Sequence, residues 1–167
     1  MSRFTVRRAL AVVALAAAVA PVAVLAGPNN VPFKASLVTQ EILHPDPAAC
    51  QAFPFLAGTT TGTGHGSHLG AVTGTGSDCV TPMTTGQFTF GNGKLTFVSA
   101  SGDELHAEYG GTLSPTATAS IYAISGTYRI TGGTGRFGTA SGSGTLSGVE
   151  NLTTLQGQLN FTGVLSY

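Results

Sequence analysis

Residues 133–138 read GTGRFG and match the G-x-G-x-x-G pattern of dinucleotide-binding loops. Such a loop needs a strand before it and a helix after it, whose N-terminus receives the pyrophosphate. A strand is expected before the loop, but the sequence that follows, TASGSGTLSG, is very poor at forming helices. We therefore expect a structural turn and no cofactor. Gly133 and Gly135 are free to adopt positive φ, and Arg136 and Phe137 re-enter the sheet, with Phe137 anchoring the corner by burial.

Histidine and carboxylate side chains offer a second possible chemistry, a metal site. His65 and His68 lie close in sequence, and His106 shares a strand face with Glu104 and Glu108. Two residues three apart in one strand point to opposite faces, so His65 and His68 converge only around a turn. None of these spacings matches a metal-ligand motif. We expect the histidines on the surface or in turns, and no metal.

A polar cluster within or at the mouth of a barrel is a third possibility. Its candidates are Glu108, Tyr109, Tyr128 and Arg129, with His68 as a further weak candidate for ligand binding. A buried carboxylate beside tyrosines is able to bind or protonate a ligand. Alternation along the strand, however, places Tyr109 on the apolar face and Glu108 on the polar one, so we expect Glu108 outside. The sequence contains no nucleophile elbow and no supported Ser/His/Asp pattern, so it assigns no catalytic residue.

The N-terminal residues 1–26 have the three parts of a signal peptide. Three arginines and no acid precede an apolar run from residue 9, which ends at the small residue Ala26. A membrane-spanning helix is the alternative, but Pro21 interrupts the run and its alanines are only weakly apolar. We predict cleavage, secretion to an extracellular or periplasmic space, and no stable membrane span afterwards.

Cleavage would leave 141 of the 167 residues, enough for one domain. We assign residues 27–57 to an N-terminal strand and a loop with a short helical turn, and residues 58–167 to the rest of the same domain. Four basic residues then face seven acids, so the mature chain lacks the basic surface that nucleic-acid binding requires.

Cys50 and Cys79 are the only cysteines, in a chain expected to reach an oxidising space. We predict a disulfide, which would stabilise the fold by roughly 3 kcal/mol in the chain-entropy model. A metal pair is the competing interpretation, but the spacing fits no zinc pattern.

The mature chain predicts strands rather than helices. Near the C-terminus Leu155, Leu159, Phe161 and Leu165 share one parity while polar residues take the other, as in a sheet with one buried face. We expect eight or nine strands, with a hairpin turn at Gly91-Asn92-Gly93 and one helical turn over residues 47–53, where Asp46 and Pro47 take the N-cap and N1 positions.

Strands at this spacing indicate a sandwich or a closed barrel, and so few charges favour the barrel, which has no exposed edges. We predict an all-β fold, an eight-stranded antiparallel, calycin-like β-barrel preceded by a cleaved signal peptide. Disorder of the Gly/Ser/Thr-rich chain is the alternative, against which the regular alternation argues.

The run YRITGGTGRFGTASGSGTLSG resembles the allene oxide cyclase and dirigent barrel-like proteins. Their G-T-G-x-F turn and small-residue A-x-G strand correspond here to residues 133–137 with Ala140 and Gly142, and HGSHLG at residues 65–70 is similar to a T-H-L-G stretch in secreted bacterial relatives. The resemblance implies an eight-stranded antiparallel barrel with an apolar cavity. The matching residues are structural ones in the turn, so the resemblance transfers no catalytic residue, and fold similarity alone does not specify an activity.

These observations lead to a secreted, disulfide-linked barrel that binds a small apolar molecule or serves as an extracellular interaction module, without chemistry of its own. The rival function is a cyclase or isomerase of lipid-like substrates, as in the plant proteins that this turn resembles. A structural or adhesive surface protein is the third, and it requires a barrel interior filled by Phe and Leu. A cavity lined by apolar groups with one or two inward polar side chains would favour the first two.

Overall fold

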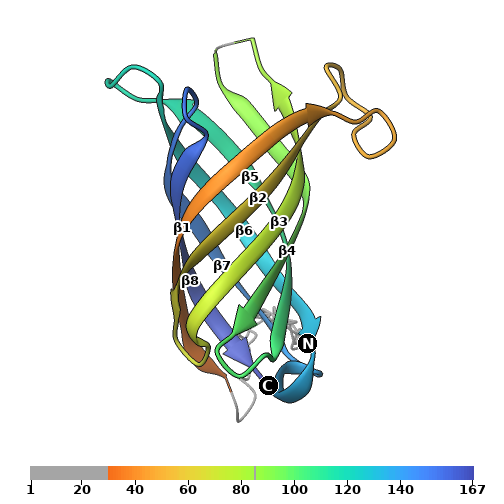
Figure 1. Ribbon diagram of the computed structural model, residues 1–167, viewed down its shortest axis with the longest axis vertical. Helices are drawn as coiled ribbons and strands as arrows, with labels where there is room; N and C mark the ends of the chain where they lie inside the picture. The colour runs from red at the N-terminus through yellow and green to blue at the C-terminus, as the bar shows by residue number, and fades with distance from the viewer. Residues whose placement is uncertain (1–29, 85) are drawn as a thin grey trace, which may run out of the picture.

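A computed structural model describes residues 30–84 and 86–167, which form a closed barrel of eight antiparallel strands (Figure 1). The strands are β1 (Val31–Pro45), β2 (Leu56–Gly66), β3 (Gly70–Pro82), β4 (Phe88–Ser99), β5 (Glu104–Pro115), β6 (Ile121–Gly133), β7 (Ser141–Asn151) and β8 (Gln156–Ser166). Each strand pairs with its neighbours in chain order, and β8 closes the barrel on β1. The predicted all-β, eight-stranded antiparallel barrel is confirmed; the predicted signal peptide, residues 1–26, lies outside the described residues.

The two ends of the barrel differ. The loops β1–β2, β3–β4, β5–β6 and β7–β8 surround the upper end in Figure 1, which we call the mouth. The β2–β3 and β4–β5 turns, the β6–β7 connection and the C-terminus lie at the opposite end, which we call the closed end. Within the described part of the chain, no helix has the length and apolar character needed to cross a membrane.

Period-two alternation places one side of every strand inside the barrel. In β8 the predicted inward residues Phe161 and Leu165 are 1% and 0% exposed, while Thr162 and Val164 between them are exposed. The buried face predicted from the C-terminal alternation is therefore the barrel interior.

Aromatic side chains fill the closed end. Phe97 and Phe161 pack edge to face with ring centroids 5.1 Å apart, and Tyr128 packs on Phe161 at 5.5 Å. The interior holds these rings because Gly144 and Gly163 carry no side chain: a Cβ on either would lie 2.7 Å from the Tyr128 hydroxyl oxygen. Many of the glycines in this sequence thus make room for large side chains on neighbouring strands.

The glycine-rich loop between β6 and β7 covers the closed end. It contains the 3-10 helix η1 (Gly135–Phe137), in which Gly135 has φ 55° and Phe137 is fully buried. The next element is strand β7, so the helix that a dinucleotide site needs does not follow the loop. Arg136 lies over the Phe137 ring and faces Asp103 with 3.4 Å between the Arg136 Nε and Asp103 Oδ2 atoms.

The predicted hairpin turn at Gly91-Asn92-Gly93 is wrong. These residues lie inside β4, which is continuous from Phe88 to Ser99. Asn92 does take positive φ, at 54°, but the result is a β-bulge, seen as a register shift between Phe90 and Gly93 against β5. A single left-handed residue bends a strand without reversing it, whereas a type I′ turn needs two in succession.

The β1–β2 loop is fastened to the barrel wall by a disulfide between Cys50 and Cys79 of β3. Before it, Asp46 Oδ1 accepts hydrogen bonds from the Ala48 and Ala49 amides at 3.0 Å each, as an N-cap does. The turn covers residues 47–49 only, which is shorter than the helical turn predicted over residues 47–53. The disulfide is consistent with an oxidising, extracellular compartment.

Candidate functional site

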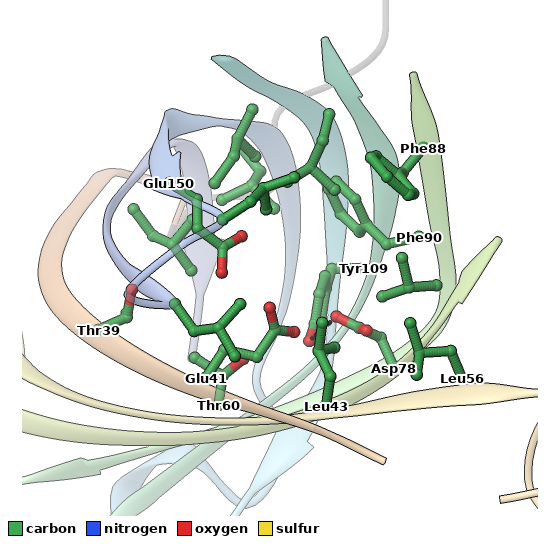
Figure 2. Close-up of a pocket in the computed structure, with 17 residues that line it drawn as sticks. Thr39, Glu41, Leu43, Leu56, Thr60, Asp78, Phe88, Phe90, Tyr109 and Glu150 are labelled. Atoms are coloured by element: carbon green, nitrogen blue, oxygen red, sulfur yellow. Dashed lines mark hydrogen bonds between the residues drawn. The ribbon is translucent and has the colours of Figure 1, made fainter. Parts of the chain in front are cut away.

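The mouth half of the barrel contains a cavity of about 190 Å³ (Figure 2). Side chains from all eight strands and from the β7–β8 loop line it. Most of them are aliphatic or aromatic: Leu43, Leu56, Val80, Phe88, Phe90, Leu113, Ile124, Leu146, Leu152, Leu155 and Leu159. The barrel interior is therefore divided into a solid aromatic core at the closed end and an apolar cavity at the mouth.

Three carboxyl groups project into this apolar cavity, from Glu41, Asp78 and Glu150 (Figure 2). They belong to β1, β3 and β7, which run toward the mouth, and each stands at an inward position near the end of its strand. None of the 17 lining residues, all in the described part of the chain, is Lys, Arg or His. The cavity therefore has acidic groups and no basic partner for them.

Asp78 is held by Tyr109 of β5, whose hydroxyl donates a 2.7 Å hydrogen bond to Asp78 Oδ2. The other oxygen, Asp78 Oδ1, is buried and accepts no hydrogen bond from the described residues. Burial raises the pKa of Asp78 to about 6, against the lowering effect of the Tyr109 hydrogen bond and with a further increase from Glu41. Burial, followed by the charge of Asp78, also raises the pKa of Tyr109, which stays a neutral donor.

Glu41 and Glu150 face each other and are hydrogen-bonded through their side chains. Burial, this hydrogen bond and the neighbouring charge of Glu150 raise the pKa of Glu41 to about 8. Burial also raises the pKa of Glu150, which is only 9% exposed. Two carboxylates this close cannot both ionise easily, so the pair retains a proton at neutral pH.

Gly58 of β2 lets Glu41 and Asp78 converge. It pairs with Asp78 in the β2–β3 ladder and faces inward between the two acids. A Cβ on Gly58 would lie 2.8 Å from Asp78 Oδ1 and closer still to a carboxylate oxygen of Glu41. The absence of a side chain at Gly58 thus lets one carboxylate oxygen of Glu41 and one of Asp78 lie close to the same backbone position.

This arrangement can do two things chemically. It can enclose a small apolar body while offering hydrogen-bond acceptors at one side of the cavity. It also holds carboxyl groups with pKa values of about 6 and 8, close to the pH at which general acids and bases work. Titratable groups perturbed in this way and lying in a cavity mark a candidate functional site.

The polar cluster predicted from Glu108, Tyr109, Tyr128 and Arg129 is divided by the barrel wall. Tyr109 points inward and lines the cavity. Tyr128, its partner across the β5–β6 ladder, also points inward but lies in the aromatic core. Its hydroxyl has no hydrogen-bond partner among the described residues, and burial raises the pKa of Tyr128 to about 12.

Glu108 and Arg129 lie on the outside of the barrel, as alternation indicates for Glu108. Arg129 Nη2 donates to Glu108 Oε2 at 2.6 Å, and Lys94 pairs with the other carboxylate oxygen. The hydrogen bonds from Lys94 and Arg129 hold the pKa of Glu108 below its ordinary value. These three residues form an exposed ion-pair group separated from the cavity by the sheet.

His68 lies at the closed end, away from the cavity. It occupies the β2–β3 turn with φ 65°, its Nε2 is 3.1 Å from the Pro32 carbonyl oxygen, and its ring packs on Tyr167. Arg136 Nη2 donates to the His68 carbonyl oxygen at 2.8 Å. Across residues 30–84 and 86–167, no group of three or more His, Cys, Asp or Glu side chains is arranged to hold a metal ion.

Glu41, Asp78 and Glu150 were not among the residues predicted from the sequence, although a signal for them exists. Glu41 shares its parity with the inward Leu37, Asp78 shares its parity with Val72, and Glu150 shares its parity with Leu146. An acid at an inward position of an otherwise apolar or glycine face is costly unless it is paired and hydrogen-bonded, so such a position marks a candidate functional residue. Asking which acids break the inward pattern would have identified all three.

Fold and site together define a closed up-and-down β-barrel with an acidic, mostly apolar cavity at its mouth. No protein-family model, curated protein or solved structure matches the chain in comparisons with known proteins.

Proposed function

We propose that this protein is exported and that its barrel mouth binds a small, mainly apolar molecule. The cavity of about 190 Å³ within an otherwise well-filled barrel carries this proposal. An apolar cavity of ~150 Å³ suffices to enclose benzene, so this cavity suits a molecule of about one ring or a short alkyl chain. The signal-peptide pattern of residues 1–26 and the Cys50–Cys79 disulfide support action outside the cytoplasm.

A cavity-filling substitution tests the proposal. Leu159 of β8 lines the cavity, whereas Val164 of the same strand is 44% exposed on the outside. Because the chain has no native tryptophan, Leu159→Trp and Val164→Trp each add one fluorescent reporter. We expect 2-phenylethanol to bind the unmodified protein and Val164→Trp, as measured by calorimetry, and to bind Leu159→Trp at least tenfold more weakly. Equal binding to both variants, or no binding to any form, would overturn the proposal.

An isomerase or cyclase acting on a lipid-like substrate is the second candidate, and a specific observation favours it. Asp78 and Tyr109 form an acid–phenol pair inside an apolar cavity, which is a suitable arrangement for proton transfer. The cavity volume limits the substrate: it is smaller than the ~300–1,000 Å³ typical of drug-sized ligand sites, so it would enclose only part of a long-chain lipid. The plant proteins that the glycine-rich turn resembles cyclise an unsaturated fatty-acid epoxide, so such an epoxide is the test substrate. Its turnover, abolished by Tyr109→Phe while 2-phenylethanol still binds, would establish this candidate over simple binding.

A further inference from the structure

The acidic groups of the cavity are not needed to bind an apolar molecule, and they are costly to keep there. Burying a carboxylate without a counter-charge is unfavourable, and no basic side chain among the lining residues offsets the charge. A barrel serving only a neutral apolar ligand would be better served by aliphatic side chains at these positions. The ligand itself therefore has to supply the positive charge that the lining residues lack.

Asp78 shows most directly what is missing. Its Oδ2 is satisfied by Tyr109, but its Oδ1 is buried and accepts no hydrogen bond within residues 30–84 and 86–167. Buried acceptors in folded proteins are nearly always paired. The free oxygen also lies on the side of Gly58, where it comes near the Glu41 carboxyl group.

The surroundings of this oxygen are otherwise apolar or acidic. The ionisable groups that line the cavity are Glu41 of β1, Asp78 of β3, Tyr109 of β5 and Glu150 of β7, and the even-numbered strands contribute Thr60 and apolar side chains. Tyr109 already donates its only proton to Asp78, and the Glu41–Glu150 pair uses its shared proton internally. The hydroxyls of Thr39 and Thr60 also line the cavity, but neither donates a hydrogen bond to Asp78 Oδ1. A ligand that supplies a donor satisfies this oxygen, and the negative charge of the cavity walls favours a cationic donor.

We propose that the mouth cavity recognises an organic cation, an ammonium group on a small apolar body, with Asp78 and the Glu41–Glu150 pair as the partners of the ammonium. This inference rests on the proposed binding function and names its ligand class. The ammonium hydrogen-bonds Asp78 Oδ1 over Gly58, and the apolar body lies against the leucine and phenylalanine side chains toward the mouth. The size of the cavity restricts the body to about one aromatic ring or an equivalent alkyl chain.

The test compares two probes with the same carbon skeleton on the disulfide-bonded protein, 2-phenylethylamine and neutral 2-phenylethanol. Calorimetry at pH 7.5 should show the amine binding at least tenfold more tightly, because charge-assisted hydrogen bonds are about twice as strong as neutral ones. This preference should shrink as the pH falls from 8 to 5, since Glu41, with a pKa of about 8, and then Asp78, with a pKa of about 6, take up protons. Equal affinities would overturn the ammonium assignment and leave the proposed apolar binding intact, whereas the absence of binding by either probe would overturn both.

Substitutions test which residues cause the preference for the amine over the alcohol. Asp78→Asn should reduce it to less than about twofold, and Glu108→Gln, which alters an exposed acid outside the barrel, should leave it unchanged. Gly58→Ala keeps every charge but pushes the Glu41 and Asp78 oxygens apart, so it should also weaken amine binding; Gly91→Ala, where a Cβ meets open space, is its control. If Asp78→Asn fails to fold, Glu41→Gln and Gly58→Ala carry the test. An amine preference that survives in every folded cavity variant would overturn the assignment.

Discussion

Replacing Glu41 with Gln should make the barrel more stable at alkaline pH and should remove much of its pH dependence. The glutamine amide can still donate to Glu150 as the protonated acid does, so the hydrogen bond between β1 and β7 is preserved. What the substitution removes is the need to ionise a carboxyl group inside an apolar cavity.

The sign and size follow from the raised pKa. In the unfolded chain Glu41 loses its proton near pH 4.5, whereas in the barrel its pKa is about 8. Between these values the folded state binds more protons than the unfolded state, so the free energy of unfolding falls as the pH rises from 4.5 through 8. At ~1.4 kcal/mol per pH unit the full effect has a ceiling of about 5 kcal/mol. Glu41 shares its proton with Glu150 and faces the open mouth, so we expect about half of this, ~2–3 kcal/mol.

Urea denaturation followed by circular dichroism, with the disulfide intact, measures the effect at pH 5 and pH 8.5. The unmodified protein should lose stability between these two pH values, and Glu41→Gln should exceed it by ~2–3 kcal/mol at pH 8.5 but by little at pH 5. Glu108→Gln is the matched control, because Lys94 and Arg129 lower the pKa of Glu108 and its ionised form is favoured over this whole range. If the unmodified protein is equally stable at both pH values, or if Glu41→Gln destabilises it at pH 8.5, the account of the carboxyl cluster is wrong.

Three further substitutions test the rest of the barrel. Replacing both Cys50 and Cys79 with Ser should lower the free energy of unfolding by about 3 kcal/mol, because the disulfide closes a loop with a sequence separation of 29; an unchanged urea midpoint would contradict a stapling role. Phe137→Ala should cost about 3–5 kcal/mol by leaving a void beneath η1, and a loss below 1 kcal/mol in the same assay would show that this ring does not close the barrel. Tyr128→Phe should raise stability by about 1 kcal/mol, since it removes a buried hydroxyl without a partner in the described chain; a loss of stability would reveal a partner for it.

The barrel could be predicted from the sequence because the alternation of inward and outward residues is a local pattern along each strand. Alternation in a stretch such as the one holding Phe161 and Leu165 assigns each residue to one face of a strand. Closure of the barrel could be predicted because the chain has many strands and few charges to protect an exposed sheet edge. Asn92 marks the limit of this reasoning. A turn residue was predicted there and its φ is positive, but whether one such residue reverses the chain or bends it depends on the pairing of β4 with β3 and β5.

The candidate site was harder to predict because it depends on register between strands. Glu41, Asp78 and Glu150 are 37 and 72 residues apart along the chain, and only the stagger of β1, β3 and β7 brings them into one cavity. The residues singled out beforehand, Glu108 and Tyr109, are neighbours in sequence, and for that reason they point to opposite sides of the wall. Consecutive residues of one strand point to opposite faces of the sheet. Residues at the same height on different strands of a barrel can point into the same part of the interior.

The two halves of the barrel interior differ in how they affect stability. At the closed end, aromatic rings fill the spaces next to glycines on neighbouring strands, and the burial of these rings stabilises the fold. At the mouth the same device, a glycine at position 58, makes room for two carboxylate oxygens, which reduce stability once they ionise. Gly58 makes room for carboxylates that lower the stability of the fold. A ligand that binds these carboxylates would offset the lost stability by its binding energy. Saturation of the cavity with 2-phenylethylamine at pH 8.5 should therefore stabilise the unmodified barrel more than it stabilises Glu41→Gln.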